Sequence, residues 1–305
     1  MTLKYSSKRA FEIVQNLPEG ISRSDIFTFK EKPDYSPPHG VKQGSLEHVI
    51  FLTLTLTIDT GCDSPALWNS ARKAYEGENT RYLFSPVSLY EDDADQILYD
   101  LRNLGLCGSK NKNSEIWKNA GTFLFQKWGG DPRNFLRSCE WDAKEILNRI
   151  IPARYLEVYD FYHFISDKKG QLWLSLLKGE VGLDQIKNLD NVPLITDIHV
   201  VRASIALGII YGTYSGQISV LSPKVRELWE VAIHEVQESG GMTTFELSEA
   251  LRNISKNGCY QRDGKRIVCP RFEHCPLSRF CAKGIYSLDN KGVFIDTTKE
   301  GTDIH

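Results

Sequence analysis

Apolar residues along most of the chain recur every three to four positions, the spacing of a helix that packs one face against a core. Residues 113–128 are an example, in which one face carries Ile116, Trp117, Ala120, Phe123 and Leu124. The pattern predicts about ten helices, no secure strand and therefore an all-α fold. We expect helices over residues 8–15, 45–59, 64–75, 96–104, 113–128, 134–150, 152–164, 167–177, 197–207, 223–237 and 243–254.

Residues 45–59, SLEHVIFLTLTLTID, are ambiguous because Leu and Thr alternate in their second half, as in a strand. We assign them to a helix because the surrounding chain is helical. Two other helices have start signals in the sequence. Ser64 before Pro65 suits an N-cap followed by proline, and Thr243 with Glu246 has the spacing of a capping box.

The composition is that of a soluble globular protein, with 41% hydrophobic and 25% charged residues among 305. The net charge of −2 argues against a strongly basic nucleic-acid binder, but it allows a local basic patch. No apolar run reaches the roughly 18 residues of a membrane span, and the N-terminus lacks the apolar core of a signal peptide. We expect no membrane association and a cytoplasmic location.

The segment Val192–Leu207, VPLITDIHVVRASIAL, places an aspartate between an apolar run and a helix. Asp197 is therefore a predicted N-cap, whose carboxylate accepts from free amides of the first helical turn. A carboxylate fixed at a helix start can act as a cap alone or also as a catalytic group. Within this stretch by itself, capping alone is the commoner explanation.

Four of the seven cysteines lie within 23 residues near the C-terminus. Without a secretion signal, such a group indicates a metal or iron–sulfur site before it indicates disulfides. The group has no C-x2-C pair of the kind usual in zinc sites, so we favour a [4Fe-4S] cluster over zinc. The proposed ligands are Cys259, Cys269, Cys275 and Cys281. Interleaved cations, Arg271 and Arg279 among them, leave a basic surface that can face phosphate.

Two lysine pairs also lie at predicted helix starts. Lys110 and Lys112 follow a glycine-broken loop, so amides and ammonium groups are available to an anion. Lys168 and Lys169 begin a helix that contains Trp173, and a partly buried lysine there can become an amine nucleophile. Alone, each pair is more commonly explained as a solvated helix start.

Taken in order, four segments resemble the helix-hairpin-helix DNA glycosylases, in particular the endonuclease III-like branch. They are LGLCGSKNKNSEIWK with the following GGDP, then FISDKKGQLWLSLL, VPLITDIHVVRASIALG and CPRFEHCPLSRFC. The matching order spans about residues 45–283. The Asp-Ile-His-Val-Val-Arg match and the terminal cysteines are its specific parts.

The resemblance implies an enzyme of base-excision repair that acts on double-stranded DNA with a damaged or mismatched base. Asp197 takes the place of the essential carboxylate, and Lys169 that of the Schiff-base lysine, with Lys168 as the register alternative. With the lysine, the enzyme is a glycosylase and abasic-site lyase; with Asp197 alone, water is the nucleophile. Expected DNA contacts are Lys110, Lys112, Arg202, Arg271 and Arg279, whereas His199 is expected to be structural.

The resemblance also implies a two-part helical fold with a catalytic cleft between the parts and a C-terminal [4Fe-4S] loop. We expect a helical domain with a degenerate hairpin over residues 45–191. Residues 1–44 and 192–286 form the second part, and residues 287–305 a polar, ragged tail. Asp197 and Lys169 are expected to face each other across the cleft of a monomer.

The chain departs from the family pattern in several places. The glycine-rich hairpin is replaced by His-Phe-Ile-Ser-Asp at residues 163–167. The segment between Lys169 and Asp197 is longer by about ten residues, which loops tolerate, and the cysteine spacing is wider. The family's base-replacing glutamine is not evident in LTLTLTIDT. Two alternatives therefore stay open: a non-catalytic iron–sulfur DNA-binding relative, and a zinc-stapled helical interaction protein.

Overall fold

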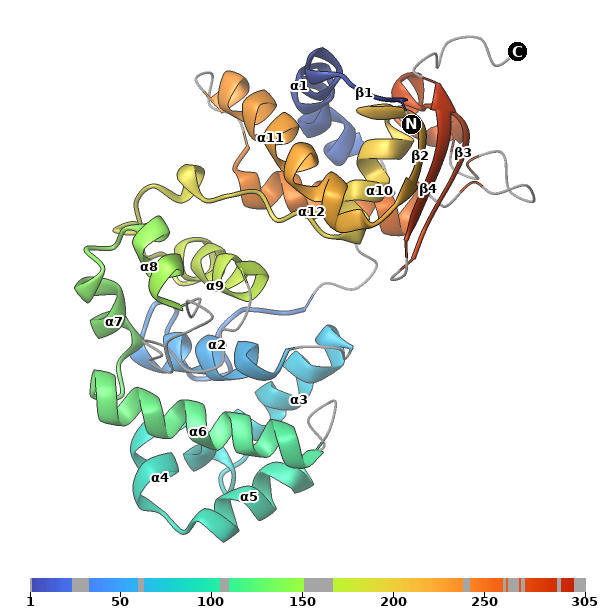
Figure 1. The fold of residues 1–305 in the computed structure, drawn as a ribbon. Helices are drawn as coiled ribbons and strands as arrows, with labels where there is room; N and C mark the ends of the chain where they lie inside the picture. The colour runs from blue at the N-terminus through green and yellow to red at the C-terminus, as the bar shows by residue number, and fades with distance from the viewer. Residues whose placement is uncertain are drawn as a thin grey trace. The chain divides into compact units, whose positions relative to one another are not determined.

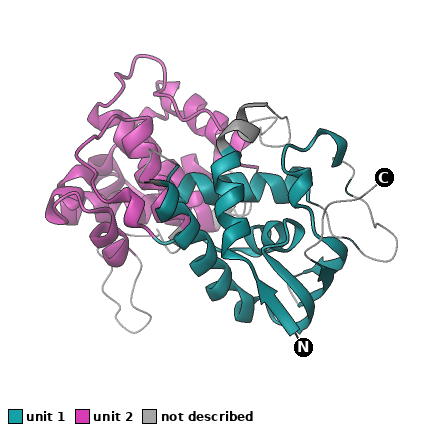
Figure 2. Ribbon diagram, turned by 90° about the horizontal axis from the view of Figure 1, so that it is seen from above, with its two compact units in different colours: residues 1–30, 193–305 teal, residues 31–192 magenta. Residues whose placement is uncertain are grey.

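The computed structural model describes residues 2–23, 33–59, 63–104, 110–150, 167–237, 242–259, 262, 269, 272–289 and 292–298. The chain divides into two compact units, and each is described by itself (Figure 2). Unit 1 comprises Met1–Lys30 with Pro193–His305, and unit 2 comprises Glu31–Val192. Nearly every described helix lies in the range where the periodicity predicts one, so the expectation of a mostly helical chain is confirmed.

Unit 2 is built from helices around α2, Leu46–Ile58 (Figure 1). The other α-helices are α3 Ser64–Glu76, α4 Pro86–Glu91, α5 Ala94–Asn103, α6 Lys110–Trp128, α7 Pro132–Ser138, α8 Ala143–Ile150 and α9 Asp167–Gly179. Short 3-10 turns lie at Arg81–Phe84 and Leu189–Asn191. Both α6 and α9 pack against α2, so α2 is the centre of this core.

The helical assignment of residues 45–59 is confirmed, and side-chain hydrogen bonds show why threonine is tolerated there. Every residue from His48 to Ile58 is buried. The hydroxyl of Thr53 donates to the Val49 carbonyl at 2.6 Å, and those of Thr55 and Thr57 bond to carbonyls of the preceding turn in the same way. The helix therefore buries polar side chains on all sides without leaving their hydroxyls unpaired.

Two details of unit 2 differ from the sequence predictions, and a third prediction is not tested. Residues 134–150 form two helices, because Glu140 and Trp141 between them adopt positive φ values of 52° and 59°. The N-cap of α3 is Asp63, not Ser64, whose hydroxyl donates to Asp59 Oδ2 at 2.7 Å. The helix predicted over residues 152–164 lies outside the described residues.

In its described residues, unit 1 combines four α-helices with a small sheet (Figure 1). Its helices are α1 Ser7–Arg23, α10 Ile198–Ala206, α11 Ile218–Gln237 and α12 Thr244–Asn257. Short 3-10 turns lie at Phe272–His274 and Ser278–Phe280. The strands are β1 Thr2–Tyr5, β2 Ile210–Gly216, β3 Lys283–Leu288 and β4 Val293–Thr298, all antiparallel in the order β1-β2-β4-β3.

The expectation that the chain has no strand is wrong, and so is the expectation of a ragged tail over the part that forms β3 and β4. In β4, Val293, Ile295 and Thr297 are buried while the residues between them are exposed. This is the period-two pattern of a half-buried strand. The strands are short: β3 and β4 form a local antiparallel hairpin, whereas β4 also pairs with β2, about 80 residues earlier in the chain. The pairing of β4 with β2 therefore has no local signal in the sequence.

The capping box that begins α12 is confirmed. Thr243 Oγ1 accepts from the Glu246 amide at 3.2 Å, and the Glu246 carboxylate accepts from the Thr243 amide at 2.7 Å. The packing of α12 against α10 positions the candidate carboxylate described below. None of the helices in the described ranges is both long and apolar enough to cross a membrane.

Candidate active site and cysteine cluster

Asp197 is the N-cap of α10, as the sequence predicts. Its Oδ1 accepts from the amides of His199 at 3.0 Å and Val200 at 3.1 Å. The side chain is 32% exposed, so part of the carboxylate faces solvent. This residue is therefore both a structural cap and an accessible anion.

The segment that leads to Asp197 is held in place by neighbouring helices. The Leu194 amide donates to Glu230 Oε1 of α11 at 2.8 Å, and the Ile195 amide donates to Ser248 Oγ of α12 at 3.2 Å. Leu194 is itself fully buried. The backbone before the cap is thus fixed by hydrogen bonds on two sides.

Arg252 of α12, which the sequence did not single out, completes the surroundings of Asp197. Its side chain is 1% exposed, and its Nε donates to Asp197 Oδ2 at 2.8 Å. Another guanidinium nitrogen, Nη1, donates to Glu249 Oε1. Arg252 lies 55 residues after Asp197, so only the fold brings the two together.

The charge state of Asp197 follows from these contacts. Burial by itself raises the pKa of a carboxyl group. Here the charge and hydrogen bond of Arg252, together with the Val200 amide, outweigh burial and hold the pKa of Asp197 below its ordinary value. The residue is therefore an anion across the neutral range and a weak proton acceptor.

Two neighbours on α10 interact with groups of unit 1. His199 Nδ1 lies 3.4 Å from Ser255 Oγ, and burial lowers the pKa of this imidazole. Arg202, predicted to contact DNA, places its guanidinium 3.4 Å from Ser255 Oγ and 3.5 Å from the Leu288 carbonyl. Arg202 is thus partly engaged with the protein.

Lys169 lies in the first turn of α9 in unit 2. Its Nζ donates to the carbonyl oxygen of Thr57, near the end of α2, at 2.6 Å. Burial lowers the pKa of Lys169 from 10.5 to about 8, and the nearby Asp59 carboxylate opposes that shift. Lys168 is exposed, so of the two register alternatives Lys169 has the environment that favours a neutral amine.

Asp59, the C-cap of α2, was not recognised from the sequence as part of this environment. Its Oδ2 accepts from Ser64 Oγ at 2.7 Å and from Trp68 Nε1 at 2.9 Å. Lys169 and Asp59 belong to unit 2, whereas Asp197 belongs to unit 1. That Asp197 faces Lys169 stays a prediction.

The four C-terminal cysteines influence one another electrostatically. Burial raises the pKa of Cys259 well above its usual range, and the neighbouring thiols of Cys281, Cys275 and Cys269 raise it further. Burial also raises the pKa of Cys281 to about 11. None of these thiols is in a disulfide, and Cys269 Sγ donates to the Gly258 carbonyl at 3.1 Å.

Arg262 is a cation that interacts with two of these thiols, Cys259 and Cys281. It is 8% exposed, donates to the Ala282 carbonyl, and lies 5.5 Å from the centre of the Tyr286 ring. Its charge lowers the pKa values of Cys259 and Cys281 against the effect of burial. Within the described residues, no three His, Cys, Asp or Glu side chains have the arrangement of a metal site.

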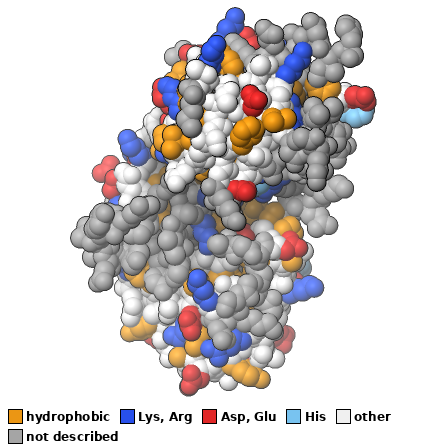
Figure 3. All heavy atoms as spheres, turned by 45° about the vertical axis from the view of Figure 1, so that its right-hand side comes forward, with side chains coloured by type: hydrophobic (Ala, Val, Ile, Leu, Met, Phe, Trp, Pro, Cys, Tyr) orange, Lys and Arg blue, Asp and Glu red, His pale blue; other side chains and the backbone are white. Residues whose placement is uncertain are grey.

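The other predicted DNA contacts are only partly described. Lys110 begins α6 and Lys112 is exposed in its first turn. Arg279 is exposed and donates to Asn16 Oδ1 at 2.6 Å, whereas Arg271 and residues 163–166 of the hairpin lie outside the described residues. On the face drawn in Figure 3, the described basic side chains are interspersed with acidic ones.

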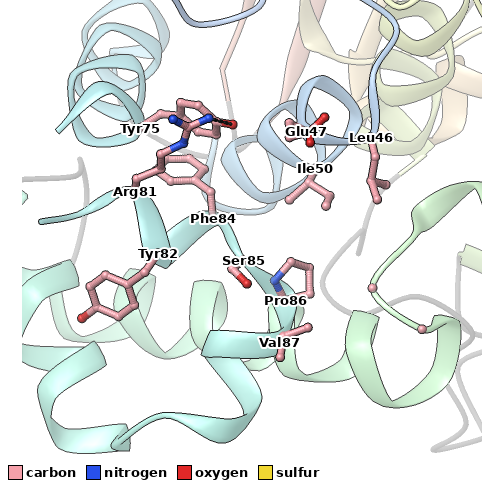
Figure 4. A pocket seen from close by; sticks show the side chains of 12 residues that line it. Leu46, Glu47, Ile50, Tyr75, Arg81, Tyr82, Phe84, Ser85, Pro86 and Val87 are labelled. Atoms are coloured by element: carbon pink, nitrogen blue, oxygen red, sulfur yellow. Dashed lines mark hydrogen bonds between the residues drawn. The ribbon is translucent and has the colours of Figure 1, made fainter. Parts of the chain in front are cut away.

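Unit 2 also holds a cavity of about 500 Å³ at the start of α2 (Figure 4). Glu47 and Ile50 lie on one side of it, and Arg81 lies against Tyr75 on the other. This cavity is at the opposite end of α2 from Thr57 and is therefore separate from the Lys169 site.

Comparison with known proteins gives no family for this chain: no family model matches it, and no curated protein sequence matches it significantly.

Proposed function

We propose that the chain is a DNA base-excision glycosylase that cleaves the N-glycosidic bond of a damaged or mismatched base in duplex DNA. The observation that carries the proposal is a carboxylate, Asp197, held as an anion at the start of α10 and still 32% exposed. When the bond breaks, both bonding electrons leave with the base and positive charge develops on the sugar. A fixed anion stabilises that charge in the transition state.

Lys169 supports a second activity of the same enzyme, abasic-site lysis. A neutral amine attacks the sugar carbon C1′ and forms a C–N bond as the bond to the base breaks, and the base leaves with the bonding electrons. The nitrogen then loses a proton and the C1′–O4′ bond breaks, so the ring opens to a Schiff base, whose β-elimination breaks the 3′ C–O bond of the strand. An amine with a pKa of about 8 is partly neutral at physiological pH. Without Lys169, water takes the place of the amine and the product is an abasic site. In either case the base must first leave the helical stack, which favours damaged or mismatched bases.

A [4Fe-4S] cluster belongs to the proposal, with zinc as the alternative metal. The residues that would hold it are Cys259, Cys269, Cys275 and Cys281. Four free thiols within electrostatic reach of one another, with Arg262 beside two of them, are a donor set that suits such a cluster. When bound, the cluster would act as a covalent cross-link within the C-terminal loop.

The test is base release in single-turnover reactions on duplexes that each carry one damaged or mismatched base. Wild-type protein is compared with Asp197→Asn, and alkaline cleavage reveals the abasic product. Asp93→Asn is the matched control, because Asp93 caps α5 through the same pair of amide contacts, outside the site. We expect base release by wild type and Asp93→Asn, and loss of about a hundredfold or more in Asp197→Asn.

Two results would contradict this function. Equal base release by wild type and Asp197→Asn would remove Asp197 from the reaction. Binding of duplex DNA with a steep salt dependence, but without release of any base in the panel, would favour the non-catalytic relative. Absence of both binding and base release would leave the interaction protein as the better interpretation.

A further inference from the structure

Asp197, Arg252 and Glu249 form a chain of charges between α10 and α12. Arg252 is nearly completely buried and donates to a carboxylate on each side. Its remaining nitrogen, Nη2, is buried without a hydrogen-bond partner among the described residues. Burying a guanidinium is costly unless it is paired, so the site is built around the position of Arg252.

The contacts use both oxygens of Asp197. Oδ1 accepts from two backbone amides, and Oδ2 accepts from Arg252 Nε at 2.8 Å. Rotation of the carboxylate would break hydrogen bonds to charged or backbone donors, which are the strong class. The orientation of the carboxylate and its negative charge are therefore fixed before any ligand binds.

We infer that Arg252 is the positioning residue of Asp197, which it holds as a permanent anion that stabilises positive charge on the sugar and takes up no proton during the reaction. This inference rests on the proposed function. It adds a mechanistic distinction, because a carboxylate in this setting acts as an electrostatic group and not as a general base. The proton of an attacking water or amine then passes to solvent water, which reaches this partly exposed site.

The competing explanation is that Arg252 only holds α12 against α10. Loss of packing lowers stability and activity at every pH, whereas loss of a charge partner changes the pH at which Asp197 protonates. Removing the guanidinium removes the largest effects that oppose burial and leaves the backbone amide and His199, so the pKa of Asp197 should rise. The pH profile of base release thus separates the two explanations.

Other charged groups near the site must be distinguished from Asp197. On the same side, α10 contributes His199 and Arg202, and α12 contributes Glu249 and Lys256. On α11, Glu230 accepts from the Leu194 amide. His199 is the one of these with an ordinary pKa near 6.5, so His199→Gln identifies any limb of the profile that comes from the imidazole.

The experiment measures single-turnover base release between about pH 4.5 and pH 9. In wild type, Asp197 should stay ionised over this range, so its protonation should cause no fall in the rate of base release at low pH. In Arg252→Met we expect a new acid limb and a fall of about tenfold to a hundredfold at neutral pH, as for a misplaced catalytic group. Arg252→Lys restores the charge and part of the rate, and Glu249→Gln changes the profile little. Arg226→Met, an arginine of α11 outside the site, controls for loss of stability.

An independent readout follows the carboxylate itself by ¹³C NMR of labelled aspartate, assigned with Asp197→Asn. In wild type, the pKa of Asp197 should lie below its ordinary value. In Arg252→Met, the pKa of Asp197 should be higher than it is in wild type. If Arg252→Met does not fold, the comparison of wild type with Arg252→Lys decides, since a poorer partner must still move the titration upward. An unchanged titration in the folded variants would overturn the inference. This readout needs no substrate, so it stands even if base release is never found.

Discussion

Lys169 Nζ donates to the carbonyl oxygen of Thr57, and this contact joins residues that are 112 positions apart in the chain. It places an amine from the start of α9 at the end of α2, where burial lowers its pKa to about 8. The partner is a backbone carbonyl, which does not protonate, so the amine keeps this acceptor at every pH. Burial lowers the pKa of Lys169, and the Asp59 carboxylate raises it.

The first prediction concerns trapping of a covalent complex with abasic-site DNA and borohydride. If Lys169 is the nucleophile, trapping should rise with pH through about 8, because only the neutral amine attacks. Lys169→Ala should lose trapping, and Lys168→Ala should keep it. Trapping that survives in both variants would show that neither Lys169 nor Lys168 is the nucleophile. Base release without trapping in wild type would indicate a monofunctional enzyme.

Asp59→Asn should move the trapping profile to lower pH. The Asp59 carboxylate raises the pKa of Lys169 against the effect of burial, so its loss lowers the pKa further. Asparagine keeps an oxygen that can accept from Ser64 and Trp68. The measurement is the midpoint of the trapping profile in wild type and variant. A midpoint that moves upward, or stays in place, would contradict the electrostatic role of Asp59.

Burial of Lys169 also predicts how stability depends on pH. Its pKa is about 8 in the folded chain, whereas the ordinary pKa of an exposed lysine is 10.5, so between these values the unfolded chain binds more protons. Stability of wild type relative to Lys169→Met must then rise as pH increases from about 8 towards 10.5, by at most about 3 kcal/mol. Urea unfolding of both proteins at pH 7 and pH 9.5 gives the difference. Parallel changes in the two proteins would contradict this pKa.

The cysteines offer a matched pair of variants. Cys269→Ser should lose bound metal, whereas Cys139→Ser should keep it, because Cys139 is buried in unit 2 outside the group of four. For a [4Fe-4S] cluster we expect about four irons and four sulfides per chain in anaerobically purified protein. One zinc in a colourless protein would favour the zinc alternative. Equal metal content in both variants would exclude Cys269 as a ligand.

Local signals in the sequence were sufficient for the parts of the site that depend on neighbouring residues. The N-cap role of Asp197 needs only the amides of the next turn, and the capping box of Thr243 and Glu246 is equally local. Arg252 could not be found in this way, because its partner Asp197 lies on another helix. The Leu–Thr alternation before Asp59 was ambiguous for a different reason. Threonine hydroxyls can donate to backbone carbonyls of the same helix, so threonine can be buried in a helix as well as in a strand.

The sheet is the part of the fold that local sequence signals did not predict. Each strand has four to seven residues, and β1 pairs with β2 across about 200 residues of sequence. The sequence of β4 contains the alternation that its burial follows, but the polar residues around it in the tail made this alternation hard to recognise. Strand pairing over such separations has no local signature, so a helical periodicity in the rest of the chain gave no information about it.

The last prediction tests the packing of α6 against α4. A Cβ on Gly121 would come within 2.1 Å of Leu89 Cδ1, so the helices approach more closely than an alanine allows. Gly121→Ala gains about 1 kcal/mol of helix propensity, but crowding in a tight core costs about 1–3 kcal/mol. We expect a net loss of stability in urea unfolding. Gly179→Ala is the control, because a Cβ there meets no atom within 4 Å.

A double variant identifies the cause of that loss. Leu89→Ala alone should destabilise unit 2, because Leu89 is fully buried. In the double variant, Leu89→Ala removes the atoms that clash with the Cβ added by Gly121→Ala. The double variant should therefore lose less stability than the sum of the losses in the two single variants. Full additivity would mean that Gly121 acts only through backbone entropy, and the close contact between α4 and α6 would then not be what requires glycine at this position.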